Sequence, residues 1–169
     1  PGDLDPTFGN GGKVIDSSVA GAIKAVAIQP DGKIVAVGSS HNVANCYSAV
    51  ATPECYFALA RFKSDGSLDG IVGGPSILGG ARSVVTQSDG KIVAVIDSVS
   101  GDFSLHRINS DLTSDTAFGG GDSIATVDFN NSNDNANAIA IDNQGRAVVV
   151  GVSNGVFALA RVLVDSPPA

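Results

Sequence analysis

The chain has 169 residues, of which 43% are hydrophobic and 16% are charged, and it holds 21 glycines but no methionine or tryptophan. This composition excludes a disordered chain and supplies enough apolar side chains for the core of one domain. The net charge of −7 argues against nucleic-acid binding, and no apolar run reaches the length of a membrane-spanning helix, which is about 20 residues.

Three related stretches of sequence predict three β-hairpins. Gln29–Val37 reads Gln-Pro-Asp-Gly-Lys-Ile-Val-Ala-Val, Gln87–Val95 repeats it with Ser88 in place of Pro, and Asp142–Val150 is a diverged copy. An Asp-Gly pair between two apolar runs is typical of a hairpin, so we expect a two-residue turn at each site. The spacing of these stretches indicates a repeat protein.

The flanking sequence predicts four strands in each repeat unit and no helix. In chain order the predicted strands are residues 13–18, 25–29, 33–39 and 56–63 in the first unit, 75–78, 82–87, 91–97 and 103–109 in the second, and 123–129, 137–142, 146–152 and 156–163 in the third. The units themselves are 13–74, 75–120 and 121–166. Residues 1–12 resemble the ends of the first two units, and we expect them to be the closing segment of a permuted third unit.

Units of this size with four antiparallel strands predict the blades of a β-propeller. The expected fold is therefore all-β: one repeat domain, 1–169, of three tandem four-stranded blades. Three blades do not fill a circle, so we expect a partial propeller. Copies of the chain would complete it as a closed homo-oligomer or a filament, or further repeats of a longer chain would do so.

Several of these motifs resemble a known family. Leu4-Asp5-Pro6-Thr7-Phe8-Gly9, Gln29–Gly38 and Phe57–Asp69 are similar to the delta-60 repeat of bacterial surface and secreted proteins. The resemblance covers nearly the whole chain, although the third unit has Gln144-Gly145 where the repeat has Asp-Gly. It implies a β-propeller-like domain of exported proteins, with no catalytic motif and no particular ligand.

The segment between the third and fourth predicted strands of the first unit is much longer than its counterpart in the second unit. It contains Cys46 and Cys55, together with His41, Tyr47 and Tyr56. A disulfide between the two cysteines would fit an extracellular or cell-surface setting, and two free thiols are the alternative. Aromatic residues on such a loop suit contact with a carbohydrate or a protein, and the alternative is a loop that only covers a sheet edge.

An arginine recurs at the same position of each unit and is followed four residues later by an aspartate. The pairs are Arg61 with Asp65, Arg107 with Asp111, and Arg161 with Asp165. Because an arginine can bond a carboxylate or turn carbonyls in a forked geometry, this repetition favours a structural ladder over a ring of ligand-binding arginines.

Two other features are candidates for chemistry. The polar run 130–135 is a candidate calcium loop, but it lacks spaced carboxylates, and an Asn-rich turn is the favoured interpretation. His106 replaces a small residue on its strand and is interpreted as a packing variant rather than a base. Catalytic motifs are absent: no nucleophile elbow, no metal-spaced histidine pair and a single glutamate, Glu54. We therefore expect no enzyme and no cofactor.

These patterns predict a non-enzymatic structural or adhesive module of an exported bacterial protein that acts by self-association or through its loop. The alternative is a lectin-like propeller that binds a carbohydrate or protein ligand at the loop between Cys46 and Cys55. A hydrolase is the least favoured hypothesis.

Overall fold

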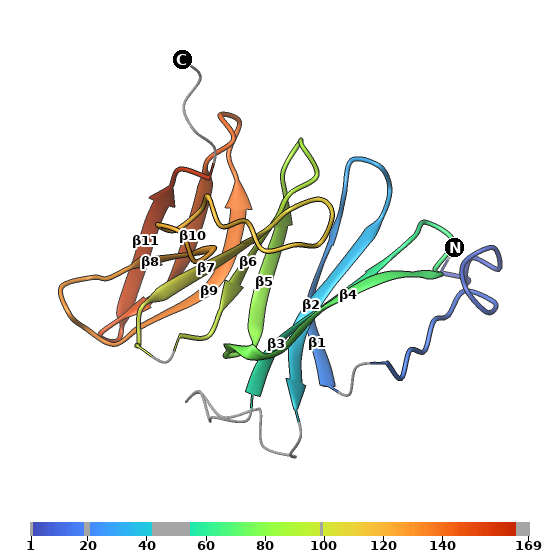
Figure 1. Cartoon of the computed structure of the whole chain (residues 1–169), viewed down its shortest axis with the longest axis horizontal. Helices are drawn as coiled ribbons and strands as arrows, with labels where there is room; N and C mark the ends of the chain where they lie inside the picture. Colours follow the sequence, from blue (N-terminus) through green and yellow to red (C-terminus); the bar gives the residue numbers. More distant parts are fainter. Residues whose placement is uncertain (1, 19–20, 42–54, 99, 165–169) are drawn as a thin grey trace.

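The computed structural model describes residues 2–18, 21–41, 55–98 and 100–164. These residues form eleven β-strands, no α-helix and therefore no helix able to cross a membrane. The strands make three antiparallel sheets that lie side by side like the blades of a fan (Figure 1). The all-β prediction is confirmed for the described residues, and the sheets are consistent with blades of a partial propeller.

Each sheet follows the chain in order. Sheet 1 contains β1 (Gly21–Ile28), β2 (Ile34–His41), β3 (Cys55–Phe62) and β4 (Leu68–Leu78). Sheet 2 contains β5 (Ala81–Thr86), β6 (Ile92–Ile96), β7 (Phe103–Ile108) and β8 (Ile124–Val127). Sheet 3 contains β9 (Asp134–Ile141), β10 (Ala147–Ser153) and β11 (Val156–Val162). The first strand of sheet 2, β5, contacts the first strands of its two neighbours, β1 and β9, where the sheets converge.

All three predicted hairpins are present, but the turn is longer than expected. The Gly32 amide donates to the Gln29 carbonyl at 2.9 Å, and the Gln29 amide donates to the Lys33 carbonyl at 2.8 Å. This arrangement is a three-residue loop in which Gly32 adopts a positive φ of 83°, and Pro30 suits its first position. The expected two-residue turn is therefore wrong, because Pro30 also belongs to the loop and the first strand of the hairpin stops pairing at Gln29, one residue earlier than expected.

The fourth strands of sheets 1 and 2 come from stretches that were predicted to open the following unit. The stretch 75–78, expected to open the second unit, is the end of β4 and pairs with β3. The stretch 123–129, expected to open the third unit, contains β8, which pairs with β7 of sheet 2. Each such strand closes the sheet before it, because the chain finishes one sheet before it crosses to the next.

Two further differences from the prediction concern the first and the last parts of the chain. The stretch 13–18 was expected to be the first strand of sheet 1, but among the described residues it makes only an isolated bridge, between Gly9 and Lys13. Sheet 3 has three described strands, not four, in the order β11-β10-β9. The edge of β11 away from β10 therefore has no strand beside it in the described part of the chain.

Side chains of two neighbouring sheets interlock to make each core. We call the side of a sheet that points towards the following sheet its forward face, and the opposite side its rear face. The forward face of sheet 1 packs on the rear face of sheet 2, and the forward face of sheet 2 packs on the rear face of sheet 3. The first core includes Val35, Val37, Phe57 and Leu59 against Ile92, Ala94 and Ile108; the second includes Val93, Val95, Phe103 and Leu105 against Ala147, Val149 and Ala158.

Candidate functional site

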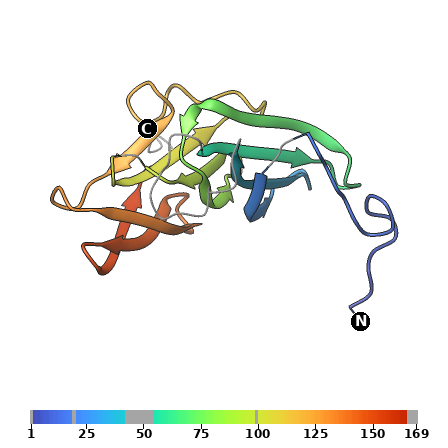
Figure 2. The ribbon, with the colours of Figure 1, turned by 90° about the horizontal axis from the view of Figure 1, so that it is seen from below.

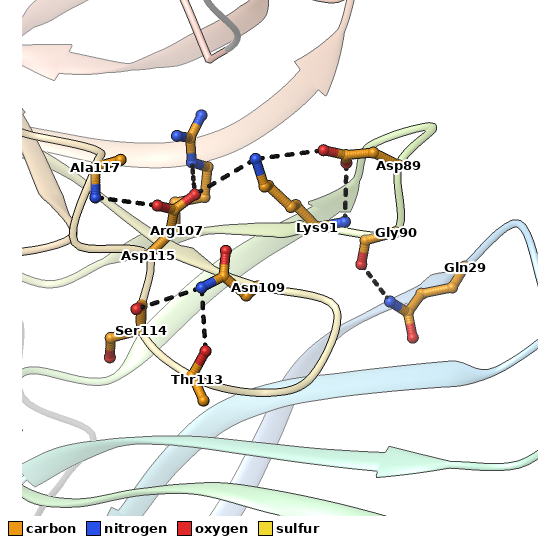
Figure 3. Close-up of polar contacts among 10 residues, drawn as sticks. All are labelled: Gln29, Asp89, Gly90, Lys91, Arg107, Asn109, Thr113, Ser114, Asp115 and Ala117. Carbon is orange, nitrogen blue, oxygen red and sulfur yellow. Dashed lines mark hydrogen bonds and ion pairs between the residues drawn. The ribbon is translucent and has the colours of Figure 1, made fainter.

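Buried arginines pin the third strand of sheets 1 and 2. In sheet 2 the Arg107 Nε lies 2.9 Å from the Asp115 Oδ2 (Figure 3). The Arg107 guanidinium also lies over the Phe118 ring, 4.5 Å from its centroid. In sheet 1 the Arg61 Nε donates to the Asp69 Oδ2 at 2.6 Å. Only 8% of the Arg61 side chain and 9% of the Arg107 side chain are exposed. Pairs that are this buried fix strand ends to turns.

These acceptors differ from the expected ones. Asp65 and Asp111 lie four residues after the arginines, as noted, but they are exposed and their Oδ1 atoms accept the amides of Ser67 and Thr113. The carboxylates that meet the arginines are eight residues on, since the chain must turn back before it can reach the strand. Asp165 lies outside the described residues.

Hydrogen bonds and nearby positive charge keep Asp69 and Asp115, the partners of the two buried arginines, ionised. For Asp69 the hydrogen bond from Arg61 lowers the pKa below its usual range. For Asp115 burial opposes ionisation, but the Ala117 amide and the Arg107 charge outweigh it, and the pKa is again lowered. Both carboxylates therefore act as permanent anions at neutral pH, as a structural ladder requires.

The third arginine stands apart from the other two. The Arg161 side chain is 57% exposed, and its Nε lies 3.6 Å from the Asp142 Oδ2. That same oxygen already accepts from the Arg146 Nε at 2.8 Å, and this bond is the main reason why the pKa of Asp142 falls to about 2. Asp142 belongs to the turn of sheet 3 and occupies the position of Gln29, not that of Asp69 or Asp115. Within the described residues, Arg161 thus lacks the kind of partner that Arg61 and Arg107 have.

Polar contacts also join sheet 1 to sheet 2. The Gln29 side-chain amide donates to the Gly90 carbonyl at 2.6 Å, from one hairpin turn to the next (Figure 3). The Arg61 Nη1 donates to the Ser110 carbonyl at 2.6 Å. These turns therefore hold the junction between sheets 1 and 2 as well as each hairpin.

The two end sheets each carry an uncovered apolar face. On the forward face of sheet 3, Phe157 is 100% exposed, Leu159 is 66% exposed and Val150 is 39% exposed. Their counterparts in sheets 1 and 2, Phe57 and Leu59 and then Phe103 and Leu105, are fully buried. On the rear face of sheet 1 a groove of about 350 Å³ is open, with Ile34, Ala60, Phe62 and Ile71 in its floor and Phe8 and Val14 at its side. Exposed apolar surfaces of this kind mark interaction sites.

The long loop of the first unit cannot be placed as a site. Cys46 and Tyr47 lie outside the described residues, so the disulfide and the loop-mediated ligand contact stay predictions. His41 and Cys55 end β2 and begin β3, where they pair with each other in the backbone register. Tyr56 follows in β3 and is half-buried.

Three carboxylates gather near the candidate calcium loop. Asp102, Asp128 and Asp134 each offer an oxygen within 4.8 Å of the others. The Asp134 carboxylate already accepts from the Phe129 amide at 2.7 Å and from the Ser132 hydroxyl at 2.6 Å. Apart from Asp134, these residues lie outside the run 130–135, so reasoning along the sequence could not group them. Because the hydrogen bonds to Asp134 come from the adjacent turn, the cluster fits a hydrogen-bonded turn as well as it fits a cation site.

His106 is fully buried between sheets 1 and 2. Its ring meets Phe57 edge to face, with 5.2 Å between ring centroids. Burial lowers its pKa to about 4, although the nearby Asp122 charge opposes the shift. A neutral imidazole shut inside an apolar core acts as a packing group.

Comparison with known proteins agrees with this architecture. The family model described as "Domain of unknown function (DUF5122) beta-propeller" matches residues 29–47 and 87–118, which begin at the hairpin turns of sheets 1 and 2 and include β2, β6 and β7. The fold and this match support a β-propeller-like repeat protein. No curated protein matches the chain.

Two solved structures are similar at low identity. Sqt1 from Chaetomium thermophilum has a TM-score of 0.43 at 10% identity, with 89% of this chain and 37% of that chain covered. A catalytically inactive virginiamycin B lyase from Staphylococcus aureus, solved with quinupristin, has a TM-score of 0.39 at 10% identity, with 86% and 57% covered. This chain therefore spans about a third to a little over half the length of these structures.

Proposed function

We propose that this chain is a non-enzymatic structural module of an exported bacterial protein and that it acts by head-to-tail self-association. The observation that carries the proposal is the uncovered forward face of sheet 3, where Phe157 and Leu159 are exposed although their counterparts are buried. The forward face is buried in sheets 1 and 2 and exposed in sheet 3, so the forward face of sheet 3 is suited to a third contact of the same kind.

The opposite end of the molecule offers the matching surface. The rear face of sheet 1 contains Ile34 and Ala36, which align with Ile92 and Ala94 of sheet 2. Ile92 and Ala94 receive the forward face of sheet 1 in the first core. The groove on sheet 1 is therefore lined by residues equivalent to those of sheet 2 that pack against sheet 1. Contact between unlike faces of two copies is heterologous, so it gives a closed ring or a filament.

The ionisable residues support the non-enzymatic part of the proposal. Arg61, Arg107, Asp69 and Asp115 are committed to pairs between strands and turns, and His106 is enclosed between two sheets. None of these groups faces the groove on sheet 1. The extracellular setting rests on the two cysteines of the sequence and on the resemblance to exported repeat proteins.

Light scattering after size exclusion tests the proposal. We expect a molar mass above that of the monomer, falling as the protein is diluted. Phe157→Ser should raise the dissociation constant about tenfold or more, because a central aromatic side chain contributes more than 1.4 kcal/mol to a typical interface. Val156→Ser is the matched control: Val156 is also exposed on β11, but its side chain points to the other face.

The outcomes are separable. If the mass stays that of the monomer at every concentration, the proposal is overturned. If association persists with equal strength in Phe157→Ser, the forward face of sheet 3 is not the contact surface.

A further inference from the structure

Sheet 2 shows how a fourth strand is built in this protein. After β7 the chain turns back at Asp115, whose carboxylate meets Arg107, and Phe118 then lies over the Arg107 guanidinium. The chain next pairs along β7, with Ile124 opposite His106 and the following residue opposite Leu105. Sheet 3 has the arginine and the third strand, but no described residue supplies the turn or the fourth strand.

The N-terminal segment has the sequence of that missing piece. Asp5, Phe8, Gly9 and Val14 are spaced as Asp115, Phe118, Gly119 and Ile124 are. In both segments the aspartate is the first residue of an Asp-x-x-Phe-Gly run, and the apolar residue that begins the strand lies nine positions after it.

The N-terminal segment also has the local shape of that piece. The Thr7 amide donates to the Asp5 Oδ1 at 2.9 Å, as the Ala117 amide donates to the Asp115 Oδ1 at 3.1 Å. The Phe8 amide donates to the Asp5 carbonyl at 3.2 Å, and the Phe118 amide donates to the Asp115 carbonyl at 3.0 Å. The turn is therefore preformed, which lowers the entropic cost of docking it.

Within its own chain the segment does not reach sheet 3. Residues 2–18 lie beside sheet 1, at the opposite end of the molecule from β11 (Figures 1 and 2). The Gly9 amide donates to the Asp65 carbonyl in the β3–β4 turn. Ile15 is 97% exposed, and the Asp5 Oδ2 makes no hydrogen bond or ion pair in the described part of the chain. The N-terminal segment and the open edge of β11 thus lie at opposite ends of the molecule.

We propose that residues 4–18 of a second copy of this chain form the fourth strand of sheet 3. This inference rests on the proposed self-association and names its specific contact. The Asp5 carboxylate of the second copy pairs with Arg161, and Phe8 covers the guanidinium as Phe118 covers Arg107. By the β7–β8 register, Val14 lies opposite Ala160 and Ile15 opposite Leu159.

The groove on sheet 1 fits this arrangement. Phe8 and Val14 form its side and the rear face of sheet 1 forms its floor, so the segment and the face belong to one binding surface. When β11 of another copy pairs with the segment, Phe157 and Leu159 point into the groove. Inside the molecule, Phe103 and Leu105 are enclosed in the same way between β8 and the rear face of sheet 3.

Charge reversal tests the contact. Asp5→Arg and Arg161→Asp each place like charges together, so each variant alone should associate at least tenfold more weakly than the wild type. An equimolar mixture of the two variants should recover the wild-type mass, because every contact between unlike chains then has opposite charges. Both side chains are exposed in the single chain, and the dilute variants should keep the wild-type melting temperature.

Asp5→Asn and Asp65→Asn separate the charge from the turn. Asn keeps the side-chain oxygen that accepts the amide two residues on, which both aspartates do. Asp5→Asn should weaken association several-fold, and Asp65→Asn, with no arginine assigned to it, should leave association unchanged.

The results discriminate between the two proposals. A monomeric wild type overturns self-association and this inference with it. A wild type that associates, with single charge reversals of undiminished strength or with no recovery on mixing, leaves self-association standing and overturns donation of the N-terminal strand.

Discussion

At the scale of single residues, His106 couples stability to pH. Its pKa of about 4 in the folded chain lies below the ordinary 6.5, because burial disfavours the imidazolium. The unfolded chain therefore binds a proton at a pH where the folded chain does not. His106 contributes its full stability above pH 6.5, and that stability is lost as the pH falls towards 4.

We expect the free energy of unfolding to drop by about 3 kcal/mol across this window from His106 alone. Denaturant unfolding at a series of pH values between 7 and about 4.5 measures the slope. The control is His106→Ala, which restores the residue found at the equivalent positions 60 and 160. Its stability at neutral pH should change because of the cavity, but its slope between these pH values should be much flatter. An unchanged slope would contradict the assignment.

At the scale of elements, the loop that leads into β8 depends on one glycine more than on its neighbour. Gly119 has a positive φ of 68°, and a Cβ there would overlap the Ile124 carbonyl oxygen. Gly120 also has a positive φ, of 89°, but a Cβ there would meet nothing within 4 Å. The two residues share the backbone conformation and differ in the space around them.

Gly120→Ala should therefore lower the free energy of unfolding by about 1 kcal/mol, the cost of a left-handed alanine. Gly119→Ala should cost at least twice as much, because the backbone must also move away from β8. Paired denaturant melts of the two variants give the comparison. Equal losses would show that the loop opens without disturbing the strand.

The hairpins can be predicted from the sequence, but the sheet to which each remaining strand belongs cannot. The three hairpins follow from Gly32, Gly90 and Gly145, because an Asp-Gly or Gln-Gly turn between apolar runs is a local signal. The assignment of β4 and β8 to the preceding sheets could not be predicted, since a repeat fixes the spacing of strands but not which neighbour each one pairs with.

The sequence contains a signal for the aspartates that pair with Arg61 and Arg107. The sequence prediction paired the arginines with Asp65 and Asp111, four residues on, whereas the structure pairs them with Asp69 and Asp115, eight residues on. The useful pattern was an aspartate repeated at one position in three copies, at Asp5, Asp69 and Asp115. Long-range pairing of an arginine with the eighth residue after it depends on the turn between them, which only the folded chain displays.

At the scale of the whole molecule, stability should be highest in the middle sheet. In a repeat protein each unit is held by its neighbours, and only sheet 2 is covered on both faces. The strands β6 and β7 are buried along their whole length, whereas β1 and β11 carry exposed apolar residues. The two end sheets are thus the parts that the proposed contact with another copy would stabilise.

Hydrogen exchange followed by mass spectrometry tests this dependence. In dilute protein, amides of β6 and β7 should exchange slowest and those of β11 much faster, because the outer edge of β11 has no described strand beside it. Raising the protein concentration should slow exchange in β11 and in residues 13–18 together and leave β6 unchanged, since a strand pair protects both partners. Phe157→Ser at the same high concentration should keep the dilute pattern. Rising molar mass with no change in β11 would mean that the copies meet through some other surface, and that the open edge of sheet 3 is stable without a partner.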